Sequence, residues 1–198
     1  LVVYFSGNGS SVGEGDLYRA LDGAGLSTLH INYRGYPGSE GSPSEGGLLL
    51  DAQAAWTEAR KTHSADRIIV LGKSLGGGVA VGLAASLTDE QPGLLVLEST
   101  FTSVPDVAAR SYPWLPVHLM MRNRFDSLSK ADKVRCETLV LHGSSDEMIP
   151  QEQGRSLARA IPGAIFMGAP GKTHNERILA YRPIWSHFLK AALKDRKQ

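Results

Sequence analysis

Short apolar runs alternate with longer helical patterns along the whole chain, and this alternation limits the fold more than any other feature. Most of the runs are continuously apolar, which is typical of parallel strands that are buried on both faces. We expect strands at residues 1–5, 28–33, 67–72, 94–99, 138–143 and 164–168. Helical patterns occupy roughly residues 13–24, 44–63, 75–88, 104–122, 151–160 and 175–195. The alternation predicts an α/β fold: a mostly parallel sheet of about six strands with helices on both faces.

The length of 198 residues fits one domain, residues 1–198, with enough chain for a sizeable core. The 21 basic residues nearly balance the 20 acidic ones, and no basic tract is interleaved with aromatic residues. We therefore expect no nucleic-acid partner. Cys136 is the single cysteine, which excludes an internal disulfide and argues against a zinc cluster. We expect no metal ion and no cofactor.

No apolar run approaches the roughly 18 residues of a membrane span, and no signal-peptide pattern is present. The sequence begins at Leu1, inside an apolar run and without a methionine. We expect N-terminal strands of the fold to be missing from it, which would leave the strand at 28–33 at a sheet edge. A cytoplasmic location is the expectation, with membrane association through a missing N-terminal segment as the alternative. The sequence does not predict the oligomeric state.

Chemically useful side chains follow several of the expected strands. In open α/β sheets, ligands bind where the strands end at their carboxyl edge. Ser74 follows the third strand in "VLGKSLGGG", Asp146 follows the fifth in "HGSSDEMIP", and His174 follows the last in "GKTHNE". A serine, an acid and a histidine are thus expected at one edge of the sheet.

The Gly72-Lys73-Ser74 triplet resembles the end of a phosphate-binding loop, but the rest of that motif is absent. The pattern G-x-x-x-x-G-K-[ST] needs a glycine five positions before Gly72, where the chain has Arg67 at the start of a strand. The four residues between them are Ile68 to Leu71, which cannot form a phosphate cradle. The sequence excludes a nucleoside-triphosphate site here.

A dinucleotide site is a weaker alternative. Gly7 and Gly9 follow the first strand, but the third glycine of the motif is displaced to Gly13. Arg34 after the second strand could meet a 2′-phosphate, as in an NADP site. This hypothesis leaves Ser74, Asp146 and His174 without a role.

Gly72-Lys73-Ser74-Leu75-Gly76 also fits a G-x-S-x-G nucleophile elbow, a tight strand-to-helix turn that exposes a serine. The serine hydroxyl needs a base, because it is a poor nucleophile at neutral pH. His174 is the preferred base, and His118 in the apolar insertion is a minor candidate. Asp146 is the preferred acid to orient the imidazole, with Glu98 as its rival.

A tetrahedral intermediate would also need N–H donors for its oxyanion. The backbone N–H of Leu75, at the start of the helix after the serine, is one expected donor. We expect the second to be the N–H of Asn8, in a loop where Gly7 and Gly9 permit close approach. The alternative is that these glycines only make the turn.

The chain resembles the α/β-hydrolase superfamily over essentially its whole length, and within it the compact serine hydrolases related to bud-emergence proteins and protein depalmitoylases. The segments that carry this resemblance are "FSGNGS", "NYRGYPGSEGSPSEGGLLLDAQAA", "GKSLGGG", "ESTFTS", "HGSSDEMIP" and "GKTHNE". The resemblance implies Ser74 as nucleophile, Asp146 as acid and His174 as base, with Asn8 and Leu75 as oxyanion donors. One departure is Ser6, which stands where these proteins usually have a histidine.

The segment 101–136 is where this fold inserts a lid, and here it is short and rich in apolar residues. It would suit an acyl group, unless its helix simply packs on the sheet. We therefore expect a cofactor-free serine hydrolase of carboxylic esters or thioesters that works through an acyl-enzyme, on a small or lipid-like acyl substrate. The alternatives are a serine peptidase of the same fold and a non-catalytic binding module on a hydrolase scaffold.

Overall fold

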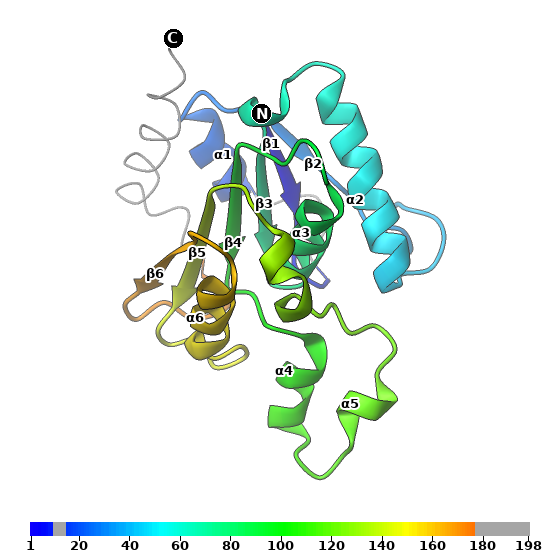
Figure 1. Ribbon diagram of the computed structural model, residues 1–198, viewed down its shortest axis with the longest axis vertical. Helices are drawn as coiled ribbons and strands as arrows, with labels where there is room; N and C mark the ends of the chain where they lie inside the picture. Colours follow the sequence, from blue (N-terminus) through cyan, green and yellow to red (C-terminus); the bar gives the residue numbers. More distant parts are fainter. Residues whose placement is uncertain (10–14, 177–198) are drawn as a thin grey trace.

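Six parallel strands form one sheet in the order β2-β1-β3-β4-β5-β6 (Figure 1). The structure is a computed structural model that describes residues 1–9 and 15–176. The strands are β1 (Val2–Phe5), β2 (Thr28–His30), β3 (Ile69–Lys73), β4 (Leu94–Glu98), β5 (Thr138–Gly143) and β6 (Ile165–Ala169). The predicted parallel α/β sheet is confirmed. β2 and β6 are the two edges of the described sheet.

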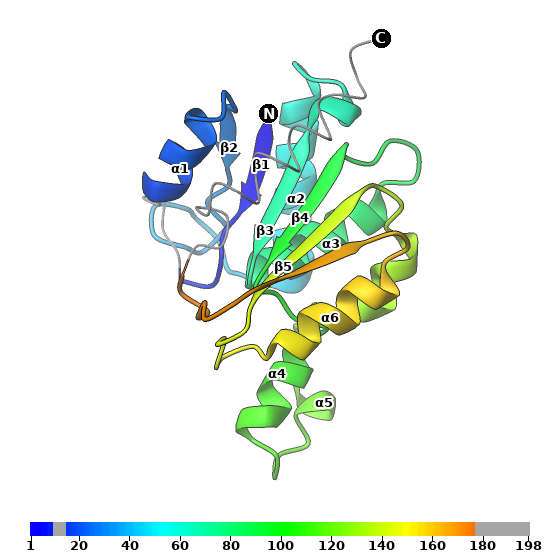
Figure 2. The same cartoon turned by 90° about the vertical axis from the view of Figure 1, so that its left-hand side faces the viewer.

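Helices cover both faces of the sheet (Figures 1 and 2). They are α1 (Gly15–Asp22), α2 (Glu45–Arg60), α3 (Leu75–Ser86), α4 (Val104–Ser111), α5 (Val117–Met120) and α6 (Gln151–Ala160). Residues of α2, α3 and α6 share one buried apolar cluster with the sheet, whereas α1 contributes to the cluster on the opposite face. None of the described helices is both long enough and apolar enough to cross a membrane.

Side chains of the central strands alternate between these two clusters. In β1, Val3 and Phe5 point into the cluster with α2, α3 and α6, and Val2 and Tyr4 point into the other. Because both faces are covered, every position of β1, β3, β4 and β5 is buried. This double burial explains why these strands appear as continuous apolar runs in the sequence.

The helical stretch expected over roughly 104–122 is divided in the structure into α4 and α5. Pro113 follows the end of α4, and Pro116 immediately precedes α5. Proline lacks an N–H and disfavours helical geometry in the residue before it, so the pair interrupts the helix. The two short helices project from one end of the sheet, away from the main body (Figure 1).

One other expectation differs at its boundary, and another is not tested. The strand expected at 28–33 ends at His30, since β2 is an edge strand whose register with β1 extends only over three residue pairs. The helix expected over 175–195 lies almost wholly outside the described residues, as does Gly13 of the dinucleotide hypothesis.

Candidate active site

Ser74 occupies a strained turn between β3 and α3. Its φ of 52° and ψ of −117° place a non-glycine residue in a region that side chains rarely adopt. The flanking glycines make the turn sterically feasible. A Cβ at Gly76 would lie 2.0 Å from the carbonyl oxygen of Phe5, and one at Gly72 would lie 2.3 Å from that of Gly76. The sequence G-x-S-x-G therefore has a direct steric reason in this turn.

The turn is also held by hydrogen bonds from the neighbouring strand. The N–H of Ser74 donates to the carbonyl of Glu98 at 2.9 Å. The hydroxyl of Thr100 donates to the carbonyl of Ser74 at 2.9 Å. These two bonds fix the backbone on both sides of the serine, so that its position is set by β4 as well as by its own strand.

Three side chains from distant parts of the sequence meet above this turn. The Oγ of Ser74 lies 3.1 Å from Nε2 of His174, although the two residues are 100 positions apart. The other ring nitrogen of His174, Nδ1, lies 2.8 Å from Oδ2 of Asp146. Both distances are within hydrogen-bonding range, so the hydroxyl, the imidazole and the carboxylate form a continuous chain.

Asp146 is buried and surrounded by donors. Its Oδ1 accepts the backbone N–H groups of Met148 and Ile149, at 3.1 and 2.8 Å. Burial on its own raises the pKa of Asp146, but the hydrogen bonds from His142, His174 and Ile149 outweigh it and hold the pKa well below its ordinary value. The carboxylate is therefore ionised and able to stabilise a positive charge on the neighbouring imidazole.

His142, a residue of β5, lies beside this carboxylate. It is fully buried, and its Nε2 donates to the carbonyl of Ile149 at 2.8 Å while lying 3.3 Å from Oδ2 of Asp146. Its Nδ1 has no hydrogen-bond partner in the described part of the chain and faces the backbone of Gly154. His142 and His174 thus both lie beside Oδ2 of Asp146, at 3.3 and 2.8 Å. The position of His142 at the end of β5 was the only sequence signal for this contact.

The two rival candidates lie elsewhere. Glu98 is the last residue of β4, and its backbone carbonyl accepts the N–H of Ser74. His118 is exposed in α5, with Nε2 at 3.7 Å from Asp106. The imidazole next to Ser74 is that of His174, and its carboxylate partner is Asp146.

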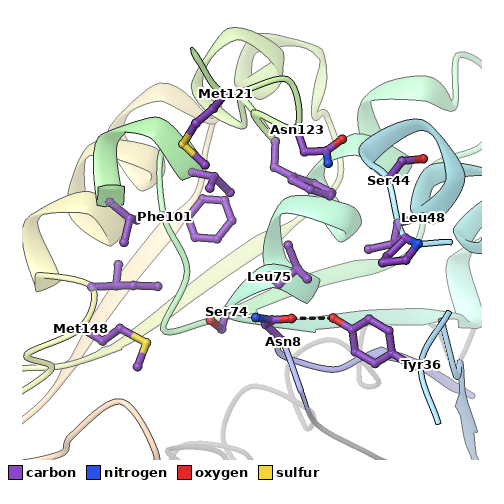
Figure 3. Close-up of a pocket in the computed structure, with 15 residues that line it drawn as sticks. Asn8, Tyr36, Ser44, Leu48, Ser74, Leu75, Phe101, Met121, Asn123 and Met148 are labelled. Atoms are coloured by element: carbon purple, nitrogen blue, oxygen red, sulfur yellow. Dashed lines mark hydrogen bonds between the residues drawn. The ribbon is translucent and has the colours of Figure 1, made fainter. Parts of the chain in front are cut away.

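Asn8 and Leu75 line the same cavity as Ser74 (Figure 3). Leu75 is the first residue of α3. The side chain of Asn8 accepts a hydrogen bond from the hydroxyl of Tyr36 at 2.8 Å, and Tyr33 donates to the carbonyl of Ser6 at 3.2 Å. Two tyrosines that follow β2 therefore brace the loop after β1, where Ser6 replaces a histidine.

A cavity of about 380 Å³ opens above Ser74 (Figure 3). Most of its wall is apolar, with Ser44, Asn8 and Asn123 as the polar exceptions. The apolar lining residues are Tyr36, Pro43, Leu48, Leu75, Phe101, Val104, Val107, Met121, Phe125, Met148 and Ile149. An extended apolar group is what such a wall accommodates, with its reactive end at the serine.

One wall of the cavity is fixed by Glu45, a residue that the sequence did not single out. Its carboxylate accepts the N–H groups of Arg124 and Phe125, at 2.8 and 2.9 Å, and pairs with Lys130 at 2.9 Å. Its own N–H donates to the side chain of Asn123 at 3.0 Å. These contacts tie the start of α2 to the segment after α5. In the sequence, Glu45 appears only as a favourable first-turn acid of a helix.

The remaining candidates have structural explanations. Nε and a terminal nitrogen of Arg34 both donate to Oδ1 of Asp51, at 3.0 and 2.7 Å. The guanidinium that the dinucleotide hypothesis assigns to a 2′-phosphate is therefore already paired with a carboxylate. Lys73 is buried rather than on the surface. Burial raises the pKa of Cys136 to about 11, so the side chain is a neutral thiol. Within residues 1–9 and 15–176, no group of three potential ligands is placed to hold a metal ion.

The sheet is parallel and has helices on both faces. A strained turn after β3 carries a serine, and an acid and a histidine follow later strands. These features define the α/β-hydrolase class. Residues 28–165 match the family model described as an alpha/beta hydrolase domain, and the chain belongs to this family. The resemblance stated from the motifs is confirmed.

Curated relatives support this assignment. The chain is 40% identical over 164 residues to an uncharacterized protein of Mycobacterium tuberculosis, covering 81% of the chain and 57% of that protein. It is 34% identical over 204 residues to protein bem46 of Schizosaccharomyces pombe, with coverage of 95% and 66%. It is 32% identical over 177 residues to the lysophosphatidylserine lipase ABHD12 of Danio rerio, with coverage of 79% and 46%. The chain thus spans about half to two thirds of the length of these relatives.

Solved structures share the fold at low sequence identity. Est1E from Butyrivibrio proteoclasticus has a TM-score of 0.77 at 17% identity, and the match covers 98% of this chain and 88% of that one. The acetyl xylan esterase from Paenibacillus sp. R4 has a TM-score of 0.75 at 19% identity, with coverage of 96% and 73%. These matches confirm the α/β-hydrolase fold.

Proposed function

We propose that the protein is a serine hydrolase that cleaves carboxylic esters or thioesters of apolar acyl groups. The observation that carries the proposal is the chain of contacts from Ser74 to His174 to Asp146, at 3.1 and 2.8 Å, together with the apolar cavity that Ser74 lines. A hydroxyl, an imidazole and an ionised carboxylate in this order are the groups that acyl transfer requires.

In the proposed reaction, Ser74 Oγ attacks the carbonyl carbon and its proton passes to Nε2 of His174. The resulting oxyanion accepts hydrogen bonds from the N–H groups of Asn8 and Leu75. Collapse of the intermediate breaks the bond to the alcohol or thiol, which leaves with the proton from His174. Water then attacks the acyl-enzyme, gives its proton to His174 and releases the acid, and the proton returns to Ser74. Asp146 stabilises the charged imidazole throughout.

The lining and volume of the cavity support an apolar acyl substrate over a charged one. Its wall is almost entirely apolar, and a volume of about 380 Å³ accommodates a hydrocarbon chain of moderate length. The ABHD12 relative of Danio rerio is named as a lysophosphatidylserine lipase, so lipid esters are a suitable first substrate panel.

The direct test is hydrolysis of p-nitrophenyl esters and acyl thioesters of increasing chain length, with the Ser74→Ala variant as control. We expect turnover by the native chain, a loss of about 10³-fold or more in Ser74→Ala, and a preference for medium over very short acyl groups. A fluorophosphonate should form one adduct, located on Ser74 by mass spectrometry.

Two results would contradict the proposal. Ester turnover that survives Ser74→Ala would show that Ser74 is not the nucleophile. A fluorophosphonate adduct on another residue would assign the nucleophile to that residue. A folded native chain that cleaves none of the esters, thioesters or peptides offered but binds acyl ligands in the cavity would indicate a binding module.

A further inference from the structure

Large apolar side chains are concentrated at the end of the α4–α5 projection. Of the nine large hydrophobic residues that are exposed in the described part of the chain, five fall within residues 112–120. We call these five residues the apolar tip: Tyr112, Trp114, Leu115, Leu119 and Met120. Trp114 is 73% exposed, Met120 63% and Leu119 88%, so the side chains face solvent rather than the sheet. Such a concentration of apolar surface indicates a partner.

The packing of the tip shows that this exposure is built into the fold. Val117 is the buried residue of α5, which turns Leu119 and Met120 outward. Pro113 and Pro116 fix the backbone on both sides of Trp114 and Leu115. The rings of Tyr112 and Trp114 pack edge to face, with centroids 6.0 Å apart. The five side chains are therefore presented by a supported segment.

The charged residues within the stretch 107–125 are all basic. No acidic residue occurs between Asp106 and Asp126, whereas Arg110, Arg122 and Arg124 lie within this stretch. Arg124 donates to the carbonyl of His118, which holds it against α5. Arg110 and Arg122 are exposed, and neither is paired with a carboxylate among the described residues. Exposed aromatic and aliphatic residues with cations beside them are typical of segments that lie in a membrane interface.

This charge distribution favours a lipid surface over a second copy of the chain. A symmetric dimer through the tip would place basic residues from both copies at one interface, without an acidic residue of 107–125 to pair with them, and like charges at an interface oppose association. An anionic membrane offers the opposite charge, while its acyl region accepts the apolar side chains.

We propose that the apolar tip docks peripherally on anionic lipid membranes, with Trp114, Leu119 and Met120 inserted at the interface and Arg110 and Arg122 at the headgroups. The tip adjoins the cavity, because Met121 directly follows Met120 and lines the cavity together with Val107 of α4. If the proposed function also holds, docking brings the opening of the cavity to the surface where a lipid ester resides.

The test is cosedimentation of the 198-residue chain with phosphatidylcholine vesicles, with and without added phosphatidylglycerol. The Ser74→Ala variant is used so that binding is measured without hydrolysis and independently of the proposed function. We expect clear binding to the anionic vesicles that weakens with salt. A Trp114→Ser/Leu119→Ser double variant should bind both vesicles about tenfold or more weakly. An Arg110→Gln/Arg122→Gln double variant should lose about 20-fold on the anionic vesicles only.

Leu50→Ser provides the matched control, because Leu50 is 57% exposed on α2, outside the tip. It should bind as the parent chain does. Unchanged thermal unfolding of each variant would show that the fold is retained. Equal binding by the parent chain and the tip variants would overturn the proposal, as would an equal loss in Leu50→Ser. Absence of vesicle binding, together with a dimer in sedimentation velocity that the tip variants abolish, would assign the surface to self-association instead.

Discussion

The carboxylate of Glu45 accepts the N–H of Phe125 at 2.9 Å, although the two residues lie 80 positions apart. Phe125 has a φ of 42°, a strained conformation for a residue with a large side chain. It lines the cavity above Ser74, so Glu45 holds one wall of that cavity in a backbone conformation that would otherwise relax. The start of α2 and the segment after α5 thereby act as one unit.

Replacing Glu45 by glutamine should loosen this unit. Glutamine removes the charge that Lys130 and two backbone N–H groups share, and we expect a loss of about 1–2 kcal/mol in the free energy of unfolding near pH 7. Urea unfolding measures it. Glu152→Gln, which breaks an exposed pair with Arg159, is the control and should change stability by less than about 0.5 kcal/mol. Equal effects of the two substitutions would contradict a special role for Glu45.

The same substitution has a predicted pH dependence. Burial raises the pKa of Glu45, but the bonds from Phe125, Lys130 and Arg124 outweigh it, and the pKa lies below the ordinary value of 4.5. A carboxylate with a lowered folded pKa stabilises the protein above its unfolded value and loses that contribution as the pH falls through the folded value. The stability difference between the native chain and Glu45→Gln should therefore shrink as the pH drops below about 4.5. A difference that stays constant would exclude this linkage.

Asp146→Asn should reduce kcat by about 10³-fold or more with little change in KM, because the amide cannot stabilise a charged imidazole. The pKa of Asp146 lies well below its ordinary value, so its carboxylate stays ionised through the mildly acidic range. Glu98→Gln tests the rival acid and should retain most of the activity of the folded enzyme. A larger loss of kcat in Glu98→Gln than in Asp146→Asn would assign the role of the acid to Glu98 instead.

His142 is expected to act as a positioning residue for Asp146. His142→Leu removes the donor beside the carboxylate, and we expect kcat to fall about tenfold while KM is unchanged. His142→Gln places an amide N–H close to the position of Nε2 and should restore part of kcat. If both variants lose stability equally and keep the native kcat, the role of His142 is structural only.

Gly78 and Gly82, which lie one turn apart in α3, offer a test of the cavity wall. A Cβ at Gly78 would lie 3.1 Å from Cβ of Phe125 and 3.2 Å from the ring of Phe101, both of which line the cavity. A Cβ at Gly82 would meet Leu49 at 3.6 Å, an ordinary contact. Gly82→Ala should raise stability by about 0.5–1 kcal/mol without changing chain-length preference. Gly78→Ala should shift the preference towards shorter acyl groups. An unchanged acyl-chain-length preference in Gly78→Ala would show that the rings of Phe101 and Phe125 do not contact the acyl group.

Strand periodicity predicted the sheet and located Ser74, Asp146 and His174, because the carboxyl ends of parallel strands converge and each of these residues follows such an end. Contacts between loops carry no comparable pattern. The backbone N–H groups of Arg124 and Phe125 donate to the carboxylate of Glu45, and a backbone donor leaves no trace in the identity of its residue. The break between α4 and α5 does have a sequence signal, since Pro113 and Pro116 mark it.

His174 follows β6, which is an edge strand of the described sheet. Two residues of β6 are exposed, whereas β3, β4 and β5 are fully buried. Edge elements open locally at lower free energy than the centre of a fold. Mild heating would therefore detach the imidazole from Ser74 while the central sheet is still intact. Ester turnover should fade at a lower temperature than the melting of the core, and it should return on cooling.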